Sequence, residues 1–149
     1  MAKQEKWLET TLRVRYSETD QMHVVYHANY LSWFEVGRTE FIRELGFPYR
    51  RFEDLGYLLP VNEANIKFKA PARYDEEILI KTRVTLCTGI RLVFSYEIRR
   101  QEDQKLLVSG ETHHAWTTKE LKPVRIDKKE PHIYSLMKEY EYVGEESHA

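Results

Sequence analysis

One long helical segment, set among strand-like segments, most strongly constrains the fold of this chain. Between residues 28 and 45, residues suited to a buried face recur at steps of four, three, four and four, at Tyr30, Phe34, Gly37, Phe41 and Leu45. This spacing predicts an amphipathic helix, and Gly46 follows as a suitable terminator. At 1.5 Å per residue the helix is about 27 Å long, nearly the size of a small domain. We therefore expect it to be the central helix.

The segments on either side of this helix alternate between apolar and polar residues, as strands with one buried face do. One such segment precedes the helix, at residues 8–16. Four follow it, at residues 61–70, 77–87, 91–100 and 105–118. Short connections between consecutive strands favour an antiparallel sheet over a βαβ array, so the predicted fold class is α+β.

The predicted sheet is too wide for a single helix to cover. Five strands about 4.8 Å apart span roughly 20 Å, whereas one helix is only about 10–12 Å across. The sheet must therefore curl around the helix, pair with a second subunit, or do both. An aromatic content of 13%, with ten tyrosines, also points to an oligomer, because aromatic residues are enriched in the centres of subunit interfaces.

The remaining segments are expected to be short. Residues 48–59 are punctuated by proline and glycine and are predicted to form a loop with at most a short helical turn. Residues 119–120 are a predicted hairpin tip, before a short return strand at 123–126. A last amphipathic helix is expected at about 131–141, before a polar and frayed tail.

Length and composition favour one domain of a reduced, cytoplasmic protein. A chain of 149 residues has the usual size of one domain, so we expect a single unit over 1–149 with its core at about 8–130. Cys87 is the only cysteine, which excludes an internal disulfide. The first eleven residues have no apolar run that could form a signal peptide or a membrane span. A net charge of -1 gives no sign of a nucleic-acid or membrane partner.

Several catalytic patterns are absent from the sequence. It has no glycine-rich phosphate loop, no dinucleotide fingerprint, no HExxH, no paired-cysteine motif and no GxSxG elbow. His113 and His114 are adjacent and point to opposite faces of a strand, so we interpret them as one exposed and one packed residue. Cys87 is interpreted as a small, half-buried residue at a strand end. No metal site and no bound cofactor is predicted.

The stretch YSETDQMHVVYHANY, residues 16–30, brings Asp20, His23 and His27 within eight residues. Asp20 falls on a loop between the first strand and the long helix. Unpaired N–H groups at the helix start, around His27, can stabilise an oxyanion, and a carboxylate beside them can attack a carbonyl or deprotonate water. Equally, Asp20 can only cap a turn and His27 only cap the helix. The residues alone leave both interpretations open.

This stretch, followed by LSWFEVGRTEFIRELG, resembles the signature of the 4-hydroxybenzoyl-CoA thioesterase-like hotdog family, in particular its small bacterial acyl-CoA thioesterases. The resemblance covers roughly residues 8–130, since TTKELKPVRI also resembles the end of the family. It implies a hotdog fold, in which a curved antiparallel sheet of five to six strands wraps a long central helix. It further implies homodimers or homotetramers with active sites between subunits.

The resemblance also implies an activity and residues for it. The expected reaction is hydrolysis of an acyl-CoA to a free acid and CoA, without a metal or organic cofactor. Asp20 would act as nucleophile or general base, and the backbone N–H of His27 would help to bind the oxyanion. Tyr26 and Asn29 match motif positions that shape the substrate pocket.

Three basic residues are candidates for binding the phosphates of CoA: Lys67, Lys69 and Arg91. Lysine and arginine side chains bind phosphates well. On the outer face of a sheet, however, such side chains are usually only solubilising. The resemblance favours the functional interpretation.

His23 departs from the family pattern, which usually has glycine or another small residue there. If the position needs a positive φ, histidine can adopt it at some cost. Its imidazole could also shift the pKa of Asp20 or narrow the acyl pocket. A second interpretation is therefore a non-catalytic hotdog module that binds acyl-CoA or an acyl carrier protein.

Overall fold

The computed structural model describes residues 3–144, and a five-stranded antiparallel sheet is its largest element. In spatial order the strands are β1 (Leu8–Arg13), β4 (Glu77–Cys87), β5 (Arg91–Arg100), β6 (Leu106–Ala115) and β3 (Val61–Phe68). Two short strands, β2 (Tyr57–Leu58) and β7 (Thr117–Thr118), form a separate antiparallel ribbon. The predicted α+β class is confirmed.

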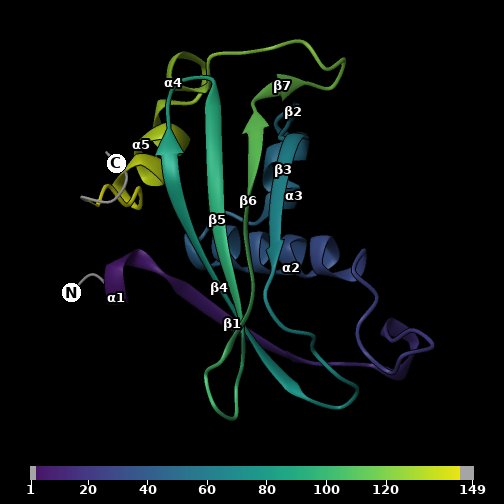
Figure 1. Ribbon diagram of the computed structural model, residues 1–149. Helices are drawn as coiled ribbons and strands as arrows, with labels where there is room; N and C mark the ends of the chain where they lie inside the picture. Colours follow the sequence, from purple (N-terminus) through teal and green to yellow (C-terminus); the bar gives the residue numbers. More distant parts are fainter. Residues whose placement is uncertain (1–2, 145–149) are drawn as a thin grey trace.

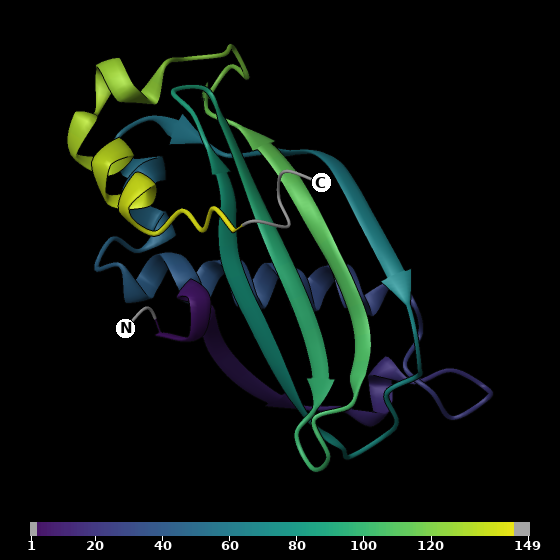
Figure 2. The ribbon, with the colours of Figure 1, turned by 60° about the vertical axis from the view of Figure 1, so that its left-hand side comes forward.

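The central helix is α2 (Asn29–Glu44), which differs from the predicted helix by one residue at each end. It crosses the strands on one face of the sheet (Figure 1), and the strands bend around it (Figure 2). The buried face of the helix includes Phe34, whose ring stacks on that of Tyr96 with centroids 4.2 Å apart. A Cβ atom on Gly37 would collide with Thr82 of β4, so this glycine lets the helix lie close to the sheet.

The shorter elements differ in places from the prediction. They are α1 (Lys3–Lys6), the 3₁₀ turn η1 (Tyr16–Glu18), α3 (Tyr49–Asp54), α4 (Ile126–Lys129) and α5 (Pro131–Glu139). The predicted return strand at 123–126 is wrong. Pro123 forms only an isolated bridge with Thr117, and Ile126 starts α4 with its N–H bonded to the carbonyl oxygen of Gly89 at 2.8 Å. Proline has no N–H with which to extend a strand ladder. The predicted tail after residue 144 lies outside the described residues.

One edge of the sheet is uncovered. β3 pairs with β6 on one side only, and seven of its eight residues are exposed. An edge strand of this length presents unpaired N–H and C=O groups to another chain. In the part of the chain that the structure describes, no helix is long and apolar enough to cross a membrane.

Candidate active site

Asp20 begins a tight hairpin turn between β1 and α2. Its N–H donates to the carbonyl oxygen of Val24 at 2.9 Å, and the N–H of His23 donates to the carbonyl oxygen of Asp20 at 2.9 Å. This pattern is typical of a three-residue loop whose last residue has a left-handed conformation. His23 is that residue, with φ of 68°. Histidine thus takes the conformation that glycine would adopt most easily, and its side chain is exposed.

The carboxylate of Asp20 is held on one side and open on the other. Oδ1 accepts the N–H of Met22 at 2.8 Å, which fixes the side chain within the turn. Within residues 3–144, no donor bonds to Oδ2. Asp20 therefore does cap a turn, as one interpretation of the sequence proposed, and it still has a free oxygen for chemistry.

The start of α2 has free N–H groups beside this turn. Asn29 donates its N–H to Tyr26 O at 2.9 Å, and Tyr30 donates its N–H to His27 O at 3.2 Å. Among the described residues, no acceptor bonds the N–H of His27 or of Ala28, and no side chain caps the helix. These two groups lie at the partially positive end of the helix dipole. They are suited to bind an oxygen that gains negative charge.

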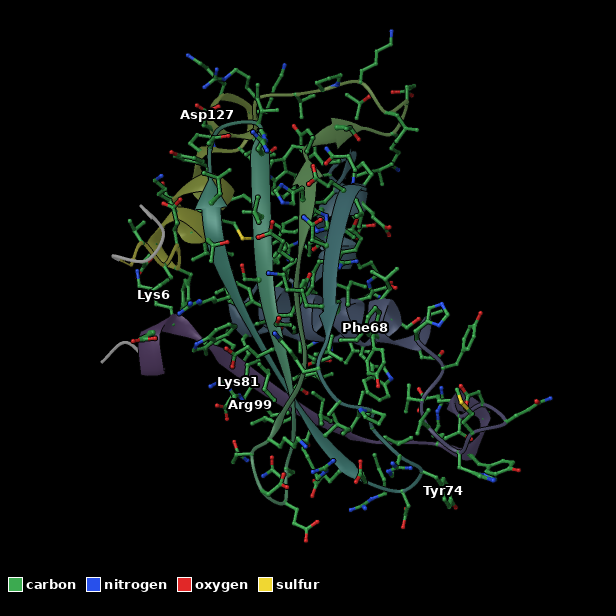
Figure 3. All side chains as sticks on the ribbon, in the orientation of Figure 1. Lys6, Phe68, Tyr74, Lys81, Arg99 and Asp127 are labelled. Atoms are coloured by element: carbon green, nitrogen blue, oxygen red, sulfur yellow. The ribbon has the colours of Figure 1, made fainter. Side chains whose placement is uncertain are left out.

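Asp20 and His27 line one cavity of about 340 Å³ at this end of α2. The other lining residues come from the turn, the first turn of the helix, the end of β3 and the segment after β3: Met22, Val24, Val25, Tyr30, Phe68, Lys69, Ala70 and Pro71. Phe68 lies beside the N-terminal end of α2 (Figure 3), with its ring centroid 5.8 Å from that of Tyr30 and 6.3 Å from that of His27. The cavity is thus largely apolar, with one carboxylate, one imidazole and one ammonium group.

The structure brings some of the other predicted residues to this cavity. Lys69 lines it. Tyr26 and Asn29 are next to lining residues in the chain but do not line the cavity themselves. The ring of Tyr26 lies 4.5 Å from that of His27, and the side chain of Asn29 donates to Glu18 O at 2.9 Å. His23 follows Met22 in the turn but is not among the lining residues.

Two predicted residues lie elsewhere in this chain. Lys67 faces the outer side of the sheet, where it lines a separate groove of about 580 Å³ together with Trp7 and Arg83. Arg91 pairs with Ala115, whereas Phe68 pairs with Val108. Seven residues of a strand span about 24 Å, so Arg91 is at the opposite end of the sheet from Phe68. Neither residue is among those that line the cavity.

The sequence analysis missed Glu18, which is 9% exposed. Its Oε2 accepts the indole N–H of Trp33 at 3.0 Å, and its Oε1 accepts the N–H of Arg15 at 2.8 Å. Its carbonyl oxygen accepts the N–H of Tyr26 at 2.8 Å as well as the side chain of Asn29. Since Trp33 is fifteen residues away, no local spacing indicates this contact.

A second polar group lies between α2 and the sheet, with Tyr96, Thr112 and His114 buried and Arg38 partly buried. Arg38 donates to the hydroxyl oxygen of Tyr96 at 3.1 Å, Tyr96 OH lies 2.7 Å from Thr112 Oγ1, and Thr112 Oγ1 lies 2.8 Å from His114 Nε2. His114 Nδ1 lies 3.0 Å from Leu59 O. Burial lowers the pKa of His114 to about 4.

Two minor predictions can also be compared with the structure. His114 is buried while His113 is half-buried on the opposite face beside Glu111, so the prediction of opposite faces is confirmed. Cys87 is more buried than predicted, at 2% exposure, and burial raises the pKa of its thiol to about 11. Over the described range, no cluster of three or more His, Cys, Asp and Glu residues is arranged to hold a metal ion.

A long helix wrapped by a curved antiparallel sheet, with a carboxylate on the turn before the helix, defines a hotdog thioesterase. The chain belongs to the Thioesterase-like superfamily, whose family model matches residues 14–132. The resemblance seen in the sequence is thereby confirmed.

Relatives and solved structures agree with this assignment. The chain is 39% identical over 120 residues to the "Putative acyl-CoA thioesterase YneP" of Bacillus subtilis, covering 80% of this chain and 87% of the relative. It is 35% identical over 95 residues to the acyl-CoA thioester hydrolase YbgC of Escherichia coli, covering 64% and 71%. A DHNA-CoA thioesterase from Staphylococcus aureus superposes with a TM-score of 0.85 at 34% identity, covering 89% of each chain. The protein is therefore a thioester hydrolase.

Proposed function

We propose that this thioester hydrolase cleaves acyl-CoA to a free acid and CoA in the cavity that Asp20 and His27 line. One observation carries the proposal: a carboxylate with a free oxygen and two unpaired helix N–H groups occur together beside a mostly apolar cavity. Two relatives bear names of acyl-CoA hydrolases, and the cavity offers apolar walls for an acyl group.

The proposed chemistry needs no group beyond these. The thioester carbonyl oxygen accepts hydrogen bonds from the N–H groups of His27 and Ala28, which stabilise the negative charge that develops on it. Asp20 takes a proton from water as the water oxygen bonds to the carbonyl carbon, or attacks that carbon itself to form an anhydride that water then opens. The C–S bond breaks in either case, and the CoA thiolate leaves and is protonated.

Lys69 is the basic residue in this chain that is best placed for a CoA phosphate, because it is exposed and lines the cavity. Lys67 and Arg91 stay predictions that require a second subunit. We propose that the uncovered edge strand β3 pairs with β3 of another copy, which would join two sheets and place those residues near a neighbouring cavity. A dimer or a dimer of dimers would satisfy this geometry.

A thiol-release assay tests the proposed function. Short-chain, long-chain and hydroxybenzoyl-CoA esters, and the corresponding acyl carrier protein esters, are incubated with the protein at pH 7. We expect sustained thiol release from at least one CoA ester, and the preferred ester defines the acyl class. Saturable binding without release from any ester would instead support the non-catalytic module. Mass measurement in solution gives the number of subunits in the same sample.

A further inference from the structure

Glu18 is a buried charged residue close to the active-site cavity, although it is not one of the residues that line it. Its carboxylate lies between α2 and the end of β1, and its position is two residues before Asp20. A buried carboxylate is unfavourable unless strong donors compensate for the lost water. Here two N–H donors do so, one to each carboxylate oxygen. The guanidinium of Arg15 also lies 3.5 Å from Oε2 of Glu18. The carboxylate of Glu18 thus satisfies the N–H of Arg15 and the indole N–H of Trp33 at the same time.

We propose that Glu18 is the positioning residue of the active site, holding Asp20 and the N–H of His27 in one fixed arrangement. This inference rests on the proposed hydrolysis. Through its carboxylate, Glu18 is anchored to Trp33, which is 1% exposed in the core of α2. Through its carbonyl oxygen, it anchors the N–H of Tyr26, the residue before His27. One residue therefore joins the helix, the turn that bears Asp20 and the oxyanion donors.

Glu18 must be a carboxylate because both of its side-chain oxygens accept a hydrogen bond. Trp33 Nε1–H and the N–H of Arg15 are donors only, and they bond to different oxygens of the carboxylate. Glutamine has one acceptor oxygen and one NH₂ group, so Glu18→Gln must place a donor against one of these donors. We expect this to displace the side chain and backbone at position 18 without loss of the fold. Since small displacements of reacting groups reduce turnover strongly, we expect kcat to fall about tenfold while KM stays nearly constant.

Trp33→Phe supplies a test that a purely structural role would not pass. It removes the indole N–H, so in a Glu18→Gln background the NH₂ group of glutamine no longer opposes a donor. We expect the double variant Glu18→Gln/Trp33→Phe to have a higher kcat than Glu18→Gln alone, by about threefold. If the two substitutions acted independently, their fold-reductions in kcat would instead multiply in the double variant. Glu40→Gln is the matched control, because Glu40 is a partly exposed glutamate of α2 that pairs with Arg43 at 2.6 Å.

The experiment measures kcat, KM and melting temperature for the wild type and these four variants with the best CoA ester. A tenfold lower kcat in Glu18→Gln at a temperature where it is fully folded, with partial recovery in the double variant, supports the positioning role. An unchanged kcat, or losses that multiply in the double variant, overturns it. If Glu18→Gln does not fold, an undiminished kcat in Trp33→Phe overturns it equally. A wild type that hydrolyses no thioester overturns the proposed function itself, and the positioning role with it.

Discussion

Two clusters of polar groups lie at α2, one at its N-terminal end and one between the helix and the sheet. They differ in how completely their hydrogen bonds are formed. The open cluster, Asp20 with the N–H groups of His27 and Ala28, has a free carboxylate oxygen and two free donors beside a cavity. The buried cluster, Arg38, Tyr96, Thr112 and His114, has its bonds formed over 2.7–3.1 Å.

The hydrogen bonds of the buried cluster form one chain, in which the direction of each bond is fixed by the next. His114 Nδ1 faces a carbonyl oxygen and must donate, so Nε2 accepts from the hydroxyl of Thr112. Thr112 then accepts from Tyr96, and Tyr96 accepts from Arg38. Each of the four side chains forms at least one of these hydrogen bonds, and the imidazole is neutral, in keeping with a pKa lowered to about 4. The proposed function therefore places the chemistry at the cluster whose hydrogen bonds are unformed beside a cavity, and not at the buried cluster.

The largest expected effect comes from removing the charge of the open cluster. Asn at position 20 can still accept the N–H of Met22, so Asp20→Asn keeps the turn but cannot act as base or nucleophile. We expect kcat to fall about 100-fold or more, with an unchanged melting temperature. Thiol-release kinetics check this, with Asp103→Asn in the exposed β5–β6 turn as control. A kcat within twofold of the wild type would assign the chemistry to another group.

The next effect is the acid sensitivity of the buried cluster. Burial lowers the pKa of His114 from its ordinary value of 6.5 to about 4 in the folded protein. Above pH 6.5 the imidazole is neutral in both states. As the pH falls toward 4, the imidazole binds a proton in the unfolded state but not in the folded state, so the free energy of unfolding decreases. The lowered pKa corresponds to about 3 kcal/mol. Urea unfolding at pH 7, 5.5 and 4 should show this loss in the wild type and a smaller one in His114→Asn. Equal losses would show that other groups dominate.

A smaller effect is expected when the buried cluster is broken at its centre. Thr112→Val keeps the side-chain volume but leaves His114 Nε2 without a donor and Tyr96 without an acceptor. Unsatisfied buried groups of this kind cost about 1–3 kcal/mol. Chemical denaturation measures the change, with Thr85→Val, from a half-buried pair on the outer face, as control. A loss as small as that of the control would mean that the cluster is not tightly bonded.

The smallest effect concerns the turn of the open cluster. Glycine at position 23 removes the strain of a left-handed residue, about 1–2 kcal/mol at most for an ordinary side chain, but adds unfolded-state entropy worth about 0.5–1 kcal/mol. We expect His23→Gly to raise the free energy of unfolding by about 0.5 kcal/mol, measured by denaturation. A loss of stability would show that the imidazole has a stabilising contact. A large gain in turnover would show that His23 restricts the native site.

The sequence predicted the fold well where periodicity alone decides it. β4 and β5 match their predicted bounds, and α2 matches within one residue at each end, because one apolar face repeats along each of them. The prediction failed at residues 123–126, where Pro123 cannot extend a ladder and the chain turns into α4. The segment does return beside β7, with the N–H of Val124 bonded to Trp116 O at 3.0 Å, but α4 begins two residues later.

The candidate site was predictable only in part. Asp20 and His27 belong to one short stretch, so the motif places them together before the structure is known. Glu18 was not identified, because its carboxylate meets Trp33 only when the turn folds back onto α2. Lys69 was predicted through the family resemblance and lines the cavity. Phe68 was not predicted, because it enters the cavity through the pairing of β3 with β6, which a single sequence does not encode as a local pattern.

The most direct test of this account is a crystal structure of Asp20→Asn with its preferred, uncleaved acyl-CoA. The account predicts the thioester carbonyl oxygen at about 2.7–3.1 Å from the N–H groups of His27 and Ala28, with the carbonyl carbon beside residue 20. A thioester bound elsewhere, for example in the groove lined by Trp7 and Arg83 on the outer face, would contradict it.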